Sequence, residues 1–145
     1  MYPREMSYEA EAVWDGLTGG NVAVGEYNVS FDTPPEYGGR GSAPCPDQLL
    51  LSAIGGCLLN TFLSFRSRLG AETRSVKVQT ECRVELRSPF GYRLTRISAT
   101  IRITPEEGDE DRNRRCAELA REYCHITRSI EPAVPVEVEI VVDIL

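Results

Sequence analysis

The chain has 145 residues, a length that suits one domain with a buried core. Apolar residues make up 41% of it and charged residues 26%, which is typical of a globular chain and excludes a disordered one. The formal net charge is −6, and because nucleic-acid binders concentrate positive charge, DNA and RNA are excluded as expected partners.

The N-terminal part is predicted to form strands. Residues 1–6 contain neither an apolar signal core nor a twin arginine, so we expect the chain to remain in the cytoplasm. Residues 7–14 alternate loosely between apolar and polar side chains, which is typical of a strand, and residues 21–27 and 28–31 are predicted to form further strand. The Gly-Gly-Asn sequence at 19–21 is expected to make the turn of this hairpin or meander.

A loop and a long helix follow. Residues 32–45 contain too many prolines and glycines for a regular element. Pro46 suits the first turn of a helix, and the pattern predicts a helix over 46–69 that ends at Gly70. Residues 48–65 carry no charge, but polar side chains interrupt them and strand patterns surround them. We therefore expect a buried central helix and no membrane span.

The second half of the chain contains three strands and a helical segment. Residues 75–86 and 92–103 alternate strictly, which predicts two half-buried strands. Residues 112–123 have an apolar stripe at helical spacing, and a short helical turn is expected after them. Residues 136–145 are rich in Val and Ile, so we expect a strand in the centre of a sheet. This order has no βαβ rhythm and predicts an α+β fold in a single domain.

Cysteines are the residues that point to chemistry. There are five, an odd number, so a full set of disulfides within one chain is impossible. No Cys-x-x-Cys pair occurs and the single histidine lacks the spacing of a zinc ligand, so no metal site is expected. Thiols in the cytoplasm stay reduced unless their chemistry is used. Two widely separated thiols can run a redox cycle, in which one is oxidised and the other resolves it as a disulfide.

Cys57 and Cys124 are the candidates for such a pair, since each interrupts or opens a helix. The alternative for both is packing, because cysteine often behaves as a small buried hydrophobe. Cys82 falls on a predicted strand and Cys116 on a helical stripe, which are ordinary core positions. Cys45, beside the helix start, is a second and less favoured candidate for the resolving thiol.

Five short motifs occur in order along nearly the whole chain. They are Gly19-Gly20, Phe31-Asp32-Thr33-Pro34-Pro35-Glu36-Tyr37-Gly38-Gly39, Pro46-Asp47-Gln48-Leu49, Gly56-Cys57, and Cys124 with Thr127-Arg128-Ser129-Ile130. Each motif is weak alone, but together they resemble the OsmC/Ohr family of thiol-dependent hydroperoxide reductases. The spacing of Cys57 from Asp47, combined with the Cys-x-x-x-Arg-x-Ile pattern at Cys124, carries most of this resemblance.

The resemblance implies a fold and a reaction. The family forms an intertwined homodimer in which antiparallel sheets surround long central helices, with two active sites at the subunit interface. One such domain would span residues 1–145. By this likeness Cys57 is the peroxidatic thiol that attacks an organic hydroperoxide, and Cys124 resolves it. A dithiol reductant, such as a lipoylated protein, restores the pair, and no cofactor is implied. Close helix packing would also explain Gly55 and Gly56, which each cost about 0.5–1 kcal/mol relative to alanine in a helix.

The chain departs from the organic-hydroperoxide branch of that family. The branch has arginine directly after its Gly-Gly turn, where this chain has Asn21, and glutamate at the helix start, where this chain has Asp47. No histidine precedes Cys124, and the only one, His125, follows it. These differences place the chain nearer the OsmC-like branches.

A thiolate at Cys57 needs a nearby cation, because a free thiol titrates near 8.5 and the helix N-terminus is about three turns away. The candidate is Arg40 in the glycine-rich loop, oriented by Asp47 through a charge-assisted contact. The alternative is that Arg40 is an ordinary solvent-exposed arginine.

Three more residues are candidates for binding substrate. Tyr37 and Ile54 would line an apolar pocket, and Thr61, one turn after Cys57, would hydrogen-bond a peroxide oxygen. The alternatives are core packing and contacts within the helix. A second function would use such a pocket without thiol chemistry, as a non-enzymatic module that binds an apolar ligand in the dimer cavity. Peroxide would then oxidise no thiol selectively.

Overall fold

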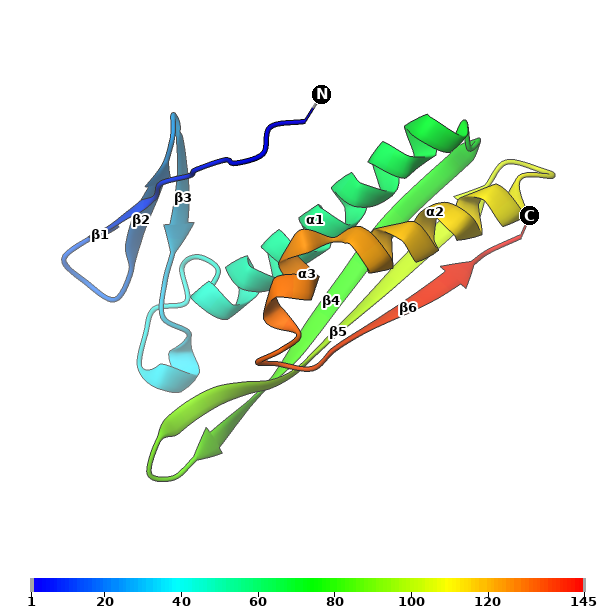
Figure 1. Cartoon of the computed structure of the whole chain (residues 1–145). Helices are drawn as coiled ribbons and strands as arrows, with labels where there is room; N and C mark the ends of the chain where they lie inside the picture. The colour runs from blue at the N-terminus through cyan, green and yellow to red at the C-terminus, as the bar shows by residue number, and fades with distance from the viewer. Residues whose placement is uncertain (1, 145) are drawn as a thin grey trace. The chain divides into compact units, whose positions relative to one another are not determined.

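The computed structural model describes residues 2–144, which form two compact units that divide between Leu50 and Leu51. The first contains a three-stranded sheet and a loop, and the second contains another three-stranded sheet with helices (Figure 1). Strands and helices follow one another in the predicted order, and the α+β class is confirmed.

The sheet of the first unit is an antiparallel meander. Its strands are β1 (Glu11–Trp14), β2 (Gly20–Val24) and β3 (Tyr27–Phe31). The loop after β3 was predicted to hold no regular structure, but it contains the short 3-10 helix η1 (Pro35–Tyr37). Pro34 before it has the extended backbone that a residue preceding proline prefers, and Pro35 has the φ that a helical first position requires.

The turns of this sheet lie elsewhere than the sequence pattern indicates. Residues 19–21 are not the turn, because Gly20 already pairs within β2. Glycine is needed at position 20 for a different reason: a Cβ there would lie 2.0 Å from the carbonyl oxygen of Val13. The chain turns instead at residues 15–19 and again at Gly25, whose φ of +61° favours glycine.

The second unit places its helices against one face of a sheet (Figure 1). The predicted bounds of the long helix are confirmed, and the boundary between the two units falls within its first turns. The elements are α1 (Pro46–Leu69), β4 (Thr73–Arg87), β5 (Gly91–Pro105), α2 (Glu110–Tyr123), α3 (His125–Ile130) and β6 (Val136–Val142).

The sheet order in this unit is β4-β5-β6, with β4 antiparallel and β6 parallel to β5. The expectation that β6 is central is therefore wrong, since β5 lies in the middle and β6 at the edge. The reason is the connection: α2 and α3 carry the chain back across the sheet, and such a crossover returns a strand parallel to the one it left. Four residues of β6 pair with buried residues of β5 and lie on its inner face, namely Val136, Val138, Ile140 and Val142, while Glu137 and Glu139 are exposed.

The core of the second unit lies between β5 and the helices. Alternate residues of β5 from Ile97 to Ile103 are at most 2% exposed. Since side chains of a strand alternate between faces, the intervening residues form the polar outer face. The helical contribution to the core consists of fully buried residues of α1 (Ile54, Leu58, Phe62) and of α2 (Cys116, Ala117, Ala120). This packing fixes which side of α1 faces α2 and α3.

Candidate active site

The Cys57 thiol faces the junction between α2 and α3. Its Sγ lies 3.9 Å from Nδ1 of His125, and the backbone N–H of Ile126 donates a hydrogen bond to it. The Cys124 thiol is also within hydrogen-bonding reach of Cys57. The structure therefore brings together the two cysteines that the sequence singled out, although 66 residues separate them in the chain.

Cys124 is held by the way α2 ends and α3 begins. It closes α2, where its N–H donates to the carbonyl oxygen of Ala120 at 2.9 Å, and it is also the residue before the first turn of α3. Its own carbonyl oxygen accepts from the hydroxyl of Thr127 at 3.0 Å and from the N–H of Arg128 at 3.1 Å. The side chain is fully buried, and both thiols are in the free form.

Burial is the main influence on the Cys57 thiol. It raises the pKa of Cys57, and a hydrogen bond with Cys124 raises it further. The N–H of Ile126 acts in the opposite direction, because it stabilises a thiolate, and Thr61 has the smallest effect, also lowering the pKa. The balance leaves Cys57 as a neutral thiol at rest, which differs from a thiol that is activated before substrate arrives.

The other predicted site residues differ in their contacts and in how exposed they are. The hydroxyl of Thr61 donates to the carbonyl oxygen of Cys57 at 2.7 Å, as one helical turn allows. Ile54 has no exposed surface, so a ligand would reach it only after neighbouring side chains move. Tyr37, in η1 of the first unit, is 52% exposed, and Asp47 is exposed in the first turn of α1.

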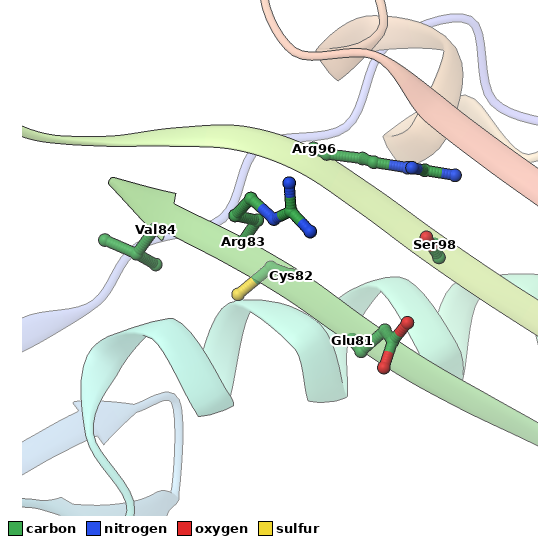
Figure 2. Close-up of a pocket in the computed structure, with 6 residues that line it drawn as sticks. All are labelled: Glu81, Cys82, Arg83, Val84, Arg96 and Ser98. Atoms are coloured by element: carbon green, nitrogen blue, oxygen red, sulfur yellow. The ribbon is translucent and has the colours of Figure 1, made fainter. Parts of the chain in front are cut away.

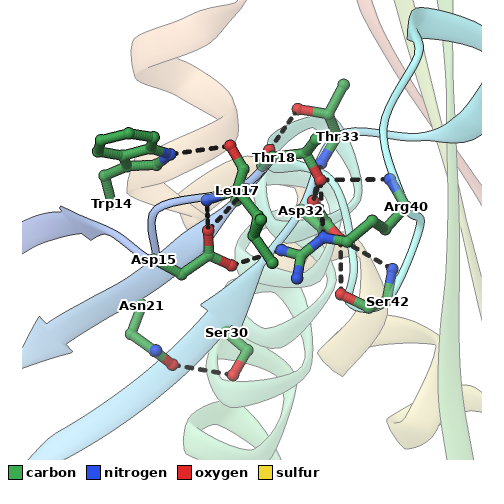
Figure 3. A network of polar contacts seen from close by, with 11 residues as sticks. Trp14, Asp15, Leu17, Thr18, Asn21, Ser30, Asp32, Thr33, Arg40 and Ser42 are labelled. Atoms are coloured by element: carbon green, nitrogen blue, oxygen red, sulfur yellow. Dashed lines mark hydrogen bonds and ion pairs between the residues drawn. The ribbon is translucent and has the colours of Figure 1, made fainter.

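Arg40 lies in a polar network within the first unit (Figure 3). Its guanidinium forms an ion pair with Asp15, donates to the hydroxyl of Thr18 at 2.9 Å and lies 3.5 Å from the carboxylate of Asp32. The neighbouring carboxylates raise the pKa of Arg40, chiefly through the hydrogen bond to Asp15. Two carboxylates thus compensate its charge where it sits, which favours the interpretation of Arg40 as a structural residue of the loop.

Asp32 is the centre of that network. Its carboxylate accepts hydrogen bonds from the hydroxyl and N–H of Ser42, from the hydroxyl of Thr18 and from the N–H of Thr33. These donors, with Ser42 first, hold the pKa of Asp32 far below its usual range. Asn21 occupies the position where the organic-hydroperoxide branch has arginine. It pairs across the sheet with Ser30, whose hydroxyl donates to the side-chain oxygen of Asn21 at 2.9 Å.

A separate surface cavity of about 460 Å³ lies over β4 and β5 (Figure 2). It is next to the irregular pairing that follows Arg83, where the register of the two strands shifts. None of its lining residues was predicted to take part in the site, and they are mainly polar: Glu81, Cys82, Arg83, Val84, Arg96 and Ser98. Among the residues that the structure describes, no group of three or more His, Cys, Asp or Glu side chains is arranged to hold a metal ion.

Comparison with known proteins identifies the family of the chain. A family model described as OsmC-like protein matches residues 39–139, which include Cys57 and Cys124. The chain belongs to the OsmC-like protein family. A relative from Bacillus subtilis (strain 168), the protein YmaD, is 25% identical over 134 residues, 89% of each chain.

Solved structures of OsmC-like proteins share the fold. The OsmC-like protein from Mycoplasma pneumoniae superposes with a TM-score of 0.81 at 14% identity, covering 97% of this chain and 99% of the other. An organic hydroperoxide resistance protein from Elizabethkingia anophelis gives 0.79 at 14% identity, with coverages of 98% and 100%. Identities this low show the fold of this OsmC-like chain and leave its chemistry to its own residues.

Two groups in the site of this OsmC-like protein were not predicted. The N–H of Ile126 has no sequence signal, because every residue but proline carries that group. His125 was noticed only for following Cys124, and its contact with Cys57 depends on the angle at which α3 leaves α2. The helical turn predicted after Cys124 was the available signal, since it limits where the next side chain can point.

Proposed function

We propose that this protein is a thiol-dependent hydroperoxide reductase with a role in peroxide defence. The observation that carries the proposal is the meeting of two free thiols, Cys57 on α1 and Cys124 before α3. Membership of the OsmC-like family and the fold shared with organic hydroperoxide resistance proteins support the same role. The proposed substrate is an organic hydroperoxide.

The reaction takes two steps. The sulfur of Cys57 attacks the terminal oxygen of ROOH, the O–O bond breaks, and the products are Cys57 sulfenic acid and ROH. The Cys124 thiol then attacks the sulfenic sulfur, forming a disulfide and releasing water. A dithiol returns the protein to its reduced form by two exchange steps and becomes a cyclic disulfide itself. Electrons thus pass from the dithiol to the peroxide, and the protein is unchanged over the cycle.

The test is to oxidise the reduced protein with one equivalent of cumene hydroperoxide and to map its cysteines by mass spectrometry. We expect a disulfide between Cys57 and Cys124 that dihydrolipoamide reverses. In the variant Cys124→Ser we expect Cys57 sulfenic acid, trapped with dimedone. The matched control is Cys116→Ser, which removes another fully buried thiol and should leave the disulfide unchanged. Equal oxidation of Cys57 and Cys82 would contradict the proposal.

Two observations favour a second function. Burial raises the pKa of Cys57, and the predicted activating cation, Arg40, is already compensated by Asp15 and Asp32. A buried neutral thiol also suits a module that binds an apolar ligand without reacting. The presence of Cys124 within reach of Cys57 weighs against this function, since a binding module needs neither thiol.

We also propose that the protein is a homodimer. Helix α1 is long and apolar enough to cross a membrane by length and composition, yet only 17% of its most apolar window is buried. Packing α1 against the same helix of a second copy would cover that surface. The proposed dimer accounts for the apolar helix without a membrane.

A further inference from the structure

His125 is the only histidine in the chain, and it lies beside the proposed peroxidatic thiol. It is the first residue of α3, its side chain is exposed, and its Nδ1 is 3.9 Å from the Sγ of Cys57. One ring nitrogen therefore faces the thiol while the exposed ring can exchange protons with water. A cysteine with a histidine within this distance is a recurring arrangement for activating a sulfur nucleophile.

A base is needed at this position. The groups that act most strongly on Cys57 are the thiol of Cys124, the N–H of Ile126 and the hydroxyl of Thr61, and none of them is a carboxylate or a guanidinium. The resting thiol must lose its proton for the sulfur to attack. Imidazole is the side chain whose ordinary titration lies near neutral pH, so it can accept that proton and later release it.

We propose that His125 is a catalytic proton carrier for Cys57. This inference rests on the proposed function and adds a residue to it. As sulfur attacks the terminal oxygen of ROOH, the proton of the Cys57 thiol moves to Nδ1 of His125. The O–O bond breaks, and the imidazolium gives a proton to the departing alkoxide, which leaves as ROH. The sulfenic acid keeps the terminal O–H, so atoms and charge balance and imidazole ends neutral.

The charged groups around His125 set the controls. On α3 the nearest is Arg128, one helical turn further on, and the last turn of α2 carries Arg121 and Glu122. All three are exposed. Arg121→Gln is the matched control. It removes a charge near the junction, and Arg121 has no proposed role in the reaction of Cys57.

The experiment measures, from pH 5 to 10, the rate constants for two reactions of Cys57: oxidation by cumene hydroperoxide and alkylation by iodoacetamide. Modified Cys57 is quantified by mass spectrometry. In the unmodified protein we expect the rate to rise in two steps as the pH increases, the first because His125 becomes able to accept a proton and the second because Cys57 itself loses its proton. His125→Gln should lose the first rise, and its oxidation rate at pH 7 should fall by about 10²-fold. Added imidazole should partly restore the rate in His125→Ala.

Two possible results would separate this inference from the proposed function. Profiles of His125→Gln that superpose on those of the unmodified protein, with an unchanged urea midpoint, would overturn the proton carrier even if peroxide oxidises Cys57. If His125→Gln loses the first rise in the alkylation rate, but peroxide does not oxidise Cys57 in the unmodified protein, the Cys57–His125 pair is supported and the proposed peroxidase function is refuted. Arg121→Gln should follow the unmodified protein in both reactions.

Discussion

Asp32 shows what a single buried carboxylate does in the first unit. Its side chain has no exposed surface, and it collects hydrogen bonds from Thr18, Thr33 and Ser42 beside the guanidinium of Arg40. Because these contacts lower the pKa of Asp32 in the folded state, they stabilise the fold above the ordinary titration of aspartate. That stabilisation is lost as the pH falls from about 4 towards the lowered pKa.

Asp32→Asn should therefore lower the free energy of unfolding at pH 7 and flatten its dependence on pH below about 4. The amide offers one acceptor where the carboxylate offers two, and its NH₂ group meets donors. Urea unfolding at several pH values measures both effects. The control Glu36→Gln, an exposed carboxylate in the first turn of η1, should change neither. If the free energy of unfolding depends on acidic pH in the same way in Asp32→Asn and in the unmodified protein, this account is contradicted.

Single residues were predictable where chain neighbours decide their role. Cys57 and Cys124 were found from the motifs around them, and the structure brings them together. The partners of Arg40 were not found, because Asp15 is distant in sequence and one of several acidic residues near the sheet. His125 was not found either, since the direction of its side chain depends on a junction between two helices.

At the scale of elements, β5 organises the second unit. It is bonded to a strand on each side, and its residue Ile101 pairs with Val78 on β4 and Ile140 on β6. The alternating pattern predicted β5 well, because alternation is a property of one strand. It could not show which strand is central, because that depends on where the crossover through α2 and α3 returns. The prediction that β6 is central was therefore wrong, because it depended only on the Val-rich sequence of that strand.

Ile101→Ala should cost about 2–5 kcal/mol of unfolding free energy, because it leaves a cavity between the sheet and the helices. Ile101→Val, which removes only one carbon atom from the side chain, should lower the unfolding free energy by about 0.5–1.5 kcal/mol. Gln79→Ala, on the exposed outer face of β4, should stay within about 0.5 kcal/mol of the unmodified protein. Chemical denaturation gives all three values, and a small effect of Ile101→Ala would argue against the core described above.

At the scale of the whole molecule, the outward side of α1 is the feature to test. Gly56 and Leu63 are two helical turns apart and so share one side of the helix, opposite the buried Leu58 and Phe62. A Cβ at Gly56 would meet nothing within 4 Å, and Leu63 is 42% exposed. Within the chain itself this side is therefore open, which is where the proposed dimer would place a second copy.

Gly56→Leu and Leu63→Glu should each raise the dimer dissociation constant by at least tenfold, because one fills the space a partner helix would occupy and the other buries a charge. Sedimentation velocity over a range of concentrations measures this. Arg114→Glu, at an exposed position on α2 and away from that side of α1, is the control and should leave the dimer intact. A monomeric unmodified protein at all concentrations would refute the homodimer.

The meeting of Cys57 and Cys124 also has a topological consequence. A disulfide between them would turn residues 57–124 into a covalent ring that contains β4, β5 and α2. Closing a loop of roughly that length removes conformational entropy from the unfolded chain worth about 4 kcal/mol. The oxidised protein would therefore be harder to unfold than the reduced one. By thermodynamic linkage, folding would favour the disulfide by the same amount, so the native structure itself would pull the proposed cycle towards its oxidised half.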